Sequence, residues 1–210
     1  MAKVLIIRAH PASSKKSNSM DMADKFKEVY KQEHPNDEVI EYNLSSGNAY
    51  PLNDTAISIY NKSLAKESLN ITEKEFREGR QKYVDEFVSA DKYVFANPMY
   101  NLFIPAEMKT YFDIVMQIPD TFHYTKDGKP EGLLKNKKAL HIQTDGGIYH
   151  GEPDMSFLDL GDQYIRSVLG IMGVSDVESI FAEGMDYAPD KADAIMEKAM
   201  SRIEECAKNF

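Results

Sequence analysis

The stretch from Tyr93 to Phe112 constrains the fold most, because a strand, a turn and a helix follow one another within it. Its first four residues form a short apolar run that is typical of a buried strand. Asn-Pro-Met-Tyr-Asn at 97–101 ends this run, since Pro98 has no amide hydrogen for a sheet. Helical spacing resumes after Pro105, which a first helical turn tolerates. We therefore predict a βα unit whose loop lies where ligands bind in open α/β sheets.

The remainder of the chain repeats this alternation of strands and helices. Apolar and β-branched runs predict further strands at 3–8, 38–44, 138–143 and 174–182. Helical spacing predicts helices over 22–30, near 57–66, from a capping box at Thr72 and Glu75, over 157–172 with Gly173 as its left-handed stop, and over 189–208. A hairpin or an excursion of the chain is expected within 120–134, on the same side as the loops.

We therefore predict one α/β domain spanning residues 1–210, with a doubly wound parallel sheet and helices on both faces. Five strands favour the flavodoxin-like order 2-1-3-4-5. In that arrangement, the loops after the first, third and fourth strands converge at one edge of the sheet. This convergence, rather than any single residue, predicts a binding site.

Composition and missing motifs exclude several classes of protein. The net charge of −9 disfavours nucleic-acid partners, and no apolar run is long enough to span a membrane. A single cysteine, Cys206, and an apolar N-terminal run too short for a signal peptide predict a cytoplasmic protein. The glycine patterns of dinucleotide-binding and P-loop folds, the nucleophile elbow and clustered zinc ligands are all absent from the sequence. We expect no metal and no catalytic nucleophile.

The first loop carries hydroxyl, amide and basic side chains just before a helix begins. These are His10, Ser13, Ser14, Lys15, Lys16, Ser17, Asn18 and Ser19. A helix N-terminus with such groups can bind phosphate, because its free N–H groups and dipole favour an anion. The alternative is a solvated loop in which Ser17 or Asn18 only caps the helix.

The second and third loops could contact the flat aromatic ring of a ligand. Met99 and Tyr100 offer a thioether and an aromatic face, although this loop taken alone favours the alternative, a Met and Tyr packed in the core beside a turn-forming Asn. The third loop, Thr144-Asp145-Gly146-Gly147, lets backbone approach a ligand closely, or is a plain turn.

An ordered set of short motifs resembles the FMN-dependent NADH-azoreductases, relatives of the flavodoxin-like NAD(P)H:quinone oxidoreductases. It comprises Ala-Asn-Pro-Met-Tyr-Asn-Leu at 96–102, Ile-Pro-x-x-Met-Lys-x-Tyr-Phe-Asp at 104–113, Thr-Phe-His-Tyr at 121–124, Pro-Glu-Gly-Leu at 130–133, Gly-Gly-Ile-Tyr at 146–149, Leu-Gly-Ile-Met-Gly at 169–173 and Phe-Ala-Glu-Gly at 181–184. The resemblance covers essentially the whole chain, and the ordered set is more specific than any one motif.

This resemblance implies bound FMN, NADH or NADPH as co-substrate, and a quinone or azo compound as electron acceptor. It places the FMN phosphate and ribityl near His10, Ser17, Asn18 and Ser19, and the flavin ring beside Pro98, Met99, Tyr100, Asn101, Leu102, Thr144, Asp145, Gly146 and Gly147. It also implies a homodimer in which Phe122, Tyr124 and Tyr149 line the substrate mouth. A non-catalytic FMN-binding electron carrier or regulatory module is the alternative, and an α/β protein without flavin is the remaining one.

Two residues depart from the family pattern. Leu102 stands where azoreductases often have Phe, and Asp145 stands where they often have Arg. A carboxylate facing the flavin would oppose its reduction, because reduced flavin tends toward an anion. We therefore predict that Asp145 points to solvent or pairs with a cation. Of the other conspicuous residues, His141 and Cys206 are expected to be structural, His150 lies at the mouth or on the surface, and Glu183 is expected to orient a loop.

Overall fold

Five parallel strands form the sheet in the spatial order β2-β1-β3-β6-β7. This confirms the flavodoxin-like order, since β6 and β7 are the fourth and fifth strands of the sheet. The computed structural model describes residues 1–10, 17–46 and 50–210. Because all five strands run the same way, their carboxyl ends share one edge of the sheet. The strands are β1 (Lys3–Arg8), β2 (Glu38–Asn43), β3 (Lys92–Pro98), β6 (Lys138–Thr144) and β7 (Asp176–Ala182).

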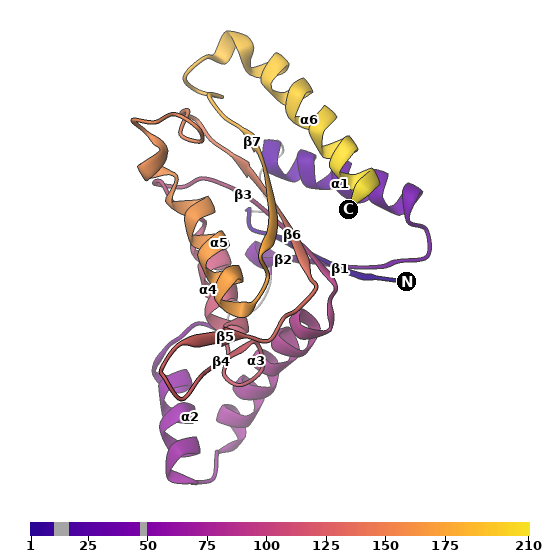
Figure 1. Cartoon of the computed structure of the whole chain (residues 1–210). Helices are drawn as coiled ribbons and strands as arrows, with labels where there is room; N and C mark the ends of the chain where they lie inside the picture. Colours follow the sequence, from indigo (N-terminus) through magenta and orange to yellow (C-terminus); the bar gives the residue numbers. More distant parts are fainter. Residues whose placement is uncertain (11–16, 47–49) are drawn as a thin grey trace.

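Helices cover both faces of the sheet (Figure 1). Leu5 and Ile7 of β1 pack towards α3, α4 and α5, whereas Val4 and Ile6 pack towards α1 and α6. The sheet is therefore buried on both sides, as its apolar strands predict. The helices are α1 (Asn18–Glu33), α2 (Asp54–Ala65), α3 (Ile71–Ser89), α4 (Ala106–Val115), α5 (Leu160–Met172) and α6 (Ala192–Asn209), with short 3-10 turns at Leu44–Ser46, Ser156–Leu158 and Pro189–Lys191.

The start of α3 differs from the predicted capping box. Asn70 is the N-cap: its side chain accepts from the N–H of Glu73, and Glu73 Oε2 accepts from the N–H of Asn70, both at 2.9 Å. The Glu73 carboxylate also accepts hydrogen bonds from the side chains of Lys62 and Ser58, both in α2. Asn70 is favoured over Thr72 as the N-cap because this position pairs free N–H groups at the start of α3. It also lets one carboxylate, that of Glu73, link α3 to α2.

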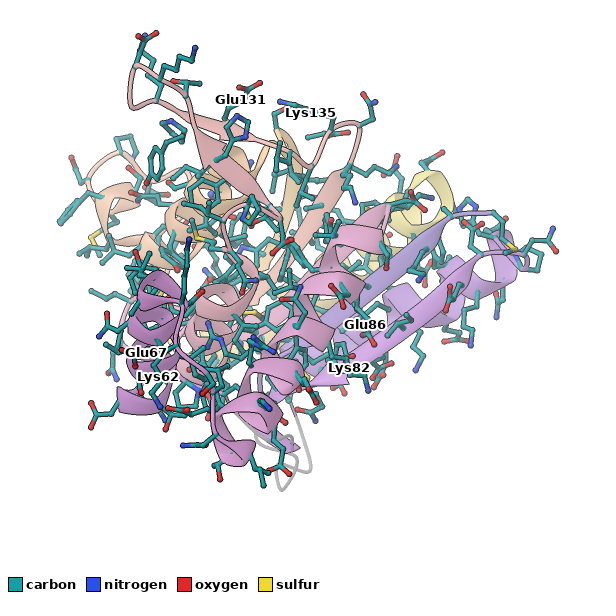
Figure 2. All side chains as sticks on the ribbon, turned by 90° about the horizontal axis from the view of Figure 1, so that it is seen from below. Lys62, Glu67, Lys82, Glu86, Glu131 and Lys135 are labelled. Carbon is teal, nitrogen blue, oxygen red and sulfur yellow. The ribbon has the colours of Figure 1, made fainter. Side chains whose placement is uncertain are left out.

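A two-stranded hairpin of β4 (Phe122–Tyr124) and β5 (Pro130–Gly132) lies at the edge opposite to the predicted one. The N–H of Leu134 donates to the carbonyl of Met172 at 2.9 Å, where α5 ends beside the amino ends of the strands. The expectation of a hairpin on the loop side is therefore wrong. The reason is that α4 carries the chain back along the sheet before the hairpin begins (Figure 1). Figure 2 looks from this end and labels Glu131 of β5.

Two further expectations concern the last third of the chain. The helix predicted over 157–172 begins at Leu160, after a 3-10 turn. Gly173 ends it with a φ of 101°, which confirms the left-handed stop. Among the described residues, no helix is long and apolar enough to cross a bilayer.

Candidate functional site

The loop after β3 is a tight two-residue turn. Tyr100 and Phe103 exchange backbone hydrogen bonds of 2.9 and 3.1 Å, and Asn101 and Leu102 between them have φ values of 51° and 67°. Two successive positive φ values are the signature of a type I′ turn. A left-handed Leu costs about 1 kcal/mol or more, and such strain is concentrated at functional sites. The turn exposes 43% of Tyr100, so this ring is not core-packed.

The loops after β6 and β7 are joined through their main chains. The N–H of Gly184 donates to the carbonyl of Gly147 at 2.7 Å, and the N–H groups of Asp186 and Tyr187 both donate to the carbonyl of Gly146 at 3.0 Å. Asp186 and Tyr187 therefore belong to the site, and sequence reasoning missed both. The signal available was the end of the fifth strand, which reaches the same edge as the other loops.

These three loops line an open pocket of about 480 Å³, a size typical of small-molecule sites. The glycines are needed for its shape. A Cβ on Gly146 would lie 2.4 Å from Asp186 Oδ2, and one on Gly147 would lie 2.8 Å from the Tyr149 hydroxyl. The lining residues are Met99, Asn101, Leu102, Gly146, Gly147, Tyr149, Asp186 and Tyr187. The structure thus brings two of the predicted loops together, with Pro98 and Thr144 paired in register beneath them.

The first loop reaches the same edge of the sheet. The N–H of Ala9 donates to the carbonyl of Ala96 at 3.0 Å, so His10 follows directly beside β3. Ser17 is the N-cap of α1, but its side chain makes no capping hydrogen bond; its Oγ lies 3.3 Å from Oγ of buried Ser19. Capping therefore does not explain the Ser17 hydroxyl, and Asn18 is the first helical residue. Ser13, Ser14, Lys15 and Lys16 lie outside the described residues.

Two residues predicted for the substrate mouth are not near the pocket within one chain. Phe122 is 7% exposed and belongs to the core, and Tyr124 packs edge-to-face on it at 5.7 Å while 57% exposed. Both lie on the hairpin at the opposite edge of the sheet. Only Tyr149, the third residue of that set, lines the pocket.

Asp145 contradicts the prediction made for it. Its side chain is 2% exposed and, within the described part of the chain, no Lys, Arg or His pairs with it. Among the described residues, the only hydrogen-bond donor to its carboxyl group is the side-chain amide of Gln143, at 3.5 Å. The sequence argument failed because it assumed that an unpaired carboxylate stays ionised. Burial raises the pKa of Asp145 to about 8, so this group is largely protonated at neutral pH.

A buried polar network lies behind the pocket. His141 Nδ1 lies 2.8 Å from Asp162 Oδ1, and its Nε2 lies 3.3 Å from Asn97 Oδ1, so His141 is structural, as expected. Burial alone would raise the pKa of Asp162, but hydrogen bonds from His141, Ser179 and Arg166 outweigh it and hold the pKa well below its usual range. Side chains of His150, Asp159 and Asp162 approach within 4.8 Å. The oxygens of Asp162 are already taken by donors, which disfavours a metal there.

The remaining expectations concern single residues near the site and at the C-terminus. Glu183 Oε1 accepts from the N–H groups of Tyr149 and His150, each at 2.7 Å, so it orients this loop as predicted. The exposed ring of His150 stacks on Phe181 at 4.2 Å. Cys206 is buried in α6, where burial raises the pKa of its thiol to about 12 and makes it inert.

Comparisons with known proteins agree with this fold. A family model described as flavodoxin-like fold matches residues 2–206. The FMN-dependent NADH:quinone oxidoreductase 2 of Lactiplantibacillus plantarum and the FMN-dependent NADH:quinone oxidoreductase of Staphylococcus carnosus are each 39% identical to this chain, over the full length of both partners.

Solved structures give the same result. The FMN complex of an FMN-dependent NADH-azoreductase from Bacillus anthracis has a TM-score of 0.94 at 29% identity, covering 100% of this chain and 99% of that one. A second azoreductase structure from Bacillus anthracis has a TM-score of 0.91 at 31% identity, with full coverage of both chains. The chain therefore belongs to the flavodoxin-like fold family that includes the FMN-dependent NADH:quinone oxidoreductases.

Proposed function

We propose that this chain is a cytoplasmic, homodimeric FMN-dependent oxidoreductase that uses NADH or NADPH to reduce quinones and to cleave azo compounds. The observation that carries the proposal is the pocket where the loops after β3, β6 and β7 meet. The full-length likeness to oxidoreductases of that name supports the same activity. We take residues 1–210 as one functional domain.

The residues present fit an FMN molecule. Gly146 and Gly147 line the pocket with backbone alone, because a Cβ on either would clash with the side chain of Asp186 or Tyr149, and the left-handed turn at Asn101 and Leu102 directs both residues to the same pocket. In this proposal, the α1 N-terminus with Ser17 and Ser19 holds the phosphate, since its dipole favours an anion. The flavin ring lies against the side chains of the β3 loop and the backbone of the β6 loop. His10, Asn18, Pro98, Tyr100, Thr144 and Asp145 complete the proposed cofactor site.

FMN supplies the two-electron chemistry when bound, by accepting hydride from the nicotinamide and passing electrons to the acceptor. The residues of the chain itself bind and orient the cofactor and its substrates. Met99 and Leu102 offer apolar contact to flat rings, Tyr149 borders the opening, and the joined loops fix the backbone at Gly146. No side chain is needed as a nucleophile. Nicotinamide and acceptor use the same opening in turn.

A homodimer explains the position of the hairpin. Phe122 and Tyr124 lie at the edge opposite to the pocket, so one chain cannot place them at its own site. Tyr124, Leu133 and Ile118 are 57%, 40% and 50% exposed, and a second copy would cover this apolar surface. We propose that Tyr124 of one copy faces the pocket of the other. Separation by size with light scattering should then show a dimer.

An electron carrier without its own nicotinamide reaction is the rival function. Anaerobic mixing with NADH separates the two: bleaching of the yellow spectrum is expected of the enzyme, and an unchanged spectrum of the carrier. Adding benzoquinone or an azo dye to the bleached protein should restore the colour, and the two rates compare the acceptors. Repeating the mixing with NADPH gives the nicotinamide preference. No bleaching with either nucleotide would exclude the proposed reaction.

A further inference from the structure

Asp145 carries a buried carboxyl group that the proposed reaction leaves unused. Within the part of the chain that the structure describes, its Oδ1 atom has no hydrogen-bond partner, and its Oδ2 atom has only Gln143 Nε2, 3.5 Å away at the outer limit of a hydrogen bond. The same Gln143 amide donates to Asp159 Oδ1 at 3.3 Å, so its donor is shared. A carboxylate with so few donors and so little water is costly to keep ionised.

The nearby cationic groups are engaged elsewhere. His141 Nδ1 and Arg166 Nε lie 2.8 and 2.6 Å from the oxygens of Asp162. His150 Nδ1 lies 3.5 Å from Asp159 Oδ2. Within residues 1–10, 17–46 and 50–210, no cationic side chain is left to neutralise a third carboxylate at this position.

The other carboxylates around Asp145 add to the effect of burial. Burial is the main cause that raises the pKa of Asp145 to about 8, and the negative charge of Glu183 raises it further. The Gln143 hydrogen bond opposes this rise, while Asp159 and Asp162 add to it. These groups come from β6, from the residue after β7 and from the start of α5, so they surround Asp145 on several sides.

The backbone ties this carboxyl group to the pocket. Asp145 immediately precedes Gly146, which lines the pocket. Its N–H donates to the carbonyl of Ala182 at 3.0 Å, and its carbonyl accepts from Met185 at 3.1 Å. A new charge in the pocket therefore acts on a fixed, buried and uncompensated group through a region of low dielectric, where charges interact strongly.

We propose that Asp145 is a proton-storing residue in alkaline solution, where its carboxyl group is ionised in the oxidised protein: it binds a proton from solvent when the cofactor becomes more negative and releases it when the electrons leave. This inference rests on the proposed FMN function. Hydride transfer adds two electrons and one proton to the cofactor site and so adds one negative charge. Above about pH 8, where Asp145 is ionised before the hydride arrives, one solvent proton on its carboxylate cancels that charge. When a quinone later takes the hydride and one solvent proton, the Asp145 proton returns to solvent.

The potential of the bound flavin should show this coupling. We would measure the two-electron reduction potential from pH 6 to pH 10 for wild type, for Asp145→Asn and for Glu33→Gln, a control at the exposed last residue of α1. One proton per two electrons changes the potential by about 30 mV per pH unit. Wild type and Glu33→Gln should show an additional slope of about 30 mV per pH unit above pH 8. Asp145→Asn should lack this additional slope, so its reduction potential above pH 8 should be less negative than that of the wild type.

Infrared spectra of the flavin-free protein give a second readout that needs no activity. Wild type should lose a protonated-carboxyl band between pH 7 and pH 10, and Asp145→Asn should show no such change. The proposal would be overturned if the plots of reduction potential against pH were parallel for wild type and Asp145→Asn. It would also be overturned if Asp145→Asn still showed the pH-dependent loss of the carboxyl band. If the flavin binds and is reduced by NADH while the lines stay parallel, only this inference fails. A protein that binds no flavin would overturn the proposed function as well.

Discussion

The N–H of Met99 donates to the carbonyl oxygen of Thr144 at 2.9 Å. This bond extends the β3–β6 pairing beyond Pro98, the last paired residue of β3. Main-chain bonds therefore position the start of the loops that follow, and the Glu183 side chain adds two further bonds to the loop after β6. A pocket built in this way keeps its shape when single side chains in the loops are replaced, which makes the following substitutions informative.

Gly147→Ala should weaken FMN binding by tenfold or more. Its Cβ would lie 2.8 Å from the Tyr149 hydroxyl, so Tyr149 or the loop would have to move in the pocket that we assign to the flavin. Fluorescence titration of flavin-free protein measures the change. Gly170→Ala in α5 is the matched control, because its Cβ would meet no atom within 4 Å. It should leave FMN binding unchanged and stabilise the helix by about 0.5–1 kcal/mol. Equal FMN affinity in Gly147→Ala would contradict the assignment.

Ser17→Ala should weaken the binding of FMN but not of riboflavin, which lacks the phosphate. Hydrogen bonds to charged groups contribute about 1.5–3 kcal/mol, so a loss of roughly ten- to a hundredfold is expected. Because the Ser17 side chain does not cap α1, the melting temperature should hardly change. Asn53→Ala is the control: it removes a side chain that does cap α2, and should lower stability without affecting FMN. An equal loss for both ligands would place Ser17 away from the phosphate.

Asp145→Asn should flatten the pH dependence of stability in the flavin-free protein. Because the pKa of Asp145 is raised in the folded state to about 8, from 3.8, its protonated form favours folding. That contribution is complete below pH 3.8 and is lost as pH rises towards 8 and above. The slope is at most about 1.4 kcal/mol per pH unit. Urea unfolding from pH 5 to pH 9 should show wild type losing stability relative to the variant. A constant difference between the two would be inconsistent with a buried titrating group.

His141→Ala should destabilise the fold by about 3 kcal/mol, because it leaves Asp162 buried without one of its main partners. His123→Ala is the control, since this histidine is half-exposed and faces Glu131 at 3.3 Å on the surface. Surface pairs of that kind contribute about 0–1 kcal/mol. Denaturant unfolding compares the two variants directly. A similar small effect for both would show that the buried network contributes little.

Mixing two inactive variants should restore activity if the site spans two copies. Gly147→Ala damages the cofactor loops, and Tyr124→Ala damages the hairpin at the other edge. In a mixed dimer, one site combines intact loops with an intact hairpin. Random re-pairing should recover about one quarter of wild-type turnover, because half of the dimers are mixed and each holds one complete site. Mixtures no more active than their parents would rule out a shared site.

Most of the fold could be predicted from the sequence, because each strand is a separate apolar run bounded by turn residues. Boundaries were less accurate: Thr72 and Glu75 match a capping box as well as Asn70 and Glu73 do. The position used in the structure is distinguished by Lys62 of α2, which binds the Glu73 carboxylate. Predicting the edge of the sheet on which the hairpin lies also requires the direction in which α4 runs, and a local sequence pattern does not give that direction.

The candidate site could be predicted in part. The loops carrying Met99 and Gly146 were expected together from the strand order, and they line one pocket. Asp186 and Tyr187 were missed, because they reach the pocket through backbone bonds to Gly146 that leave no residue pattern. Asp145 was predicted wrongly, since the burial of its side chain is not visible in the local sequence, and the three carboxylates that also raise its pKa come from other segments of the chain.

The most direct test of the central claim is a visible-absorption titration of the purified, flavin-free protein with FMN. If the loops near Ser17, Met99 and Gly146 surround one flavin, the spectrum should saturate at one FMN per chain, and protein purified without stripping should be yellow. A colourless protein whose spectrum shows no change on adding FMN would contradict the account.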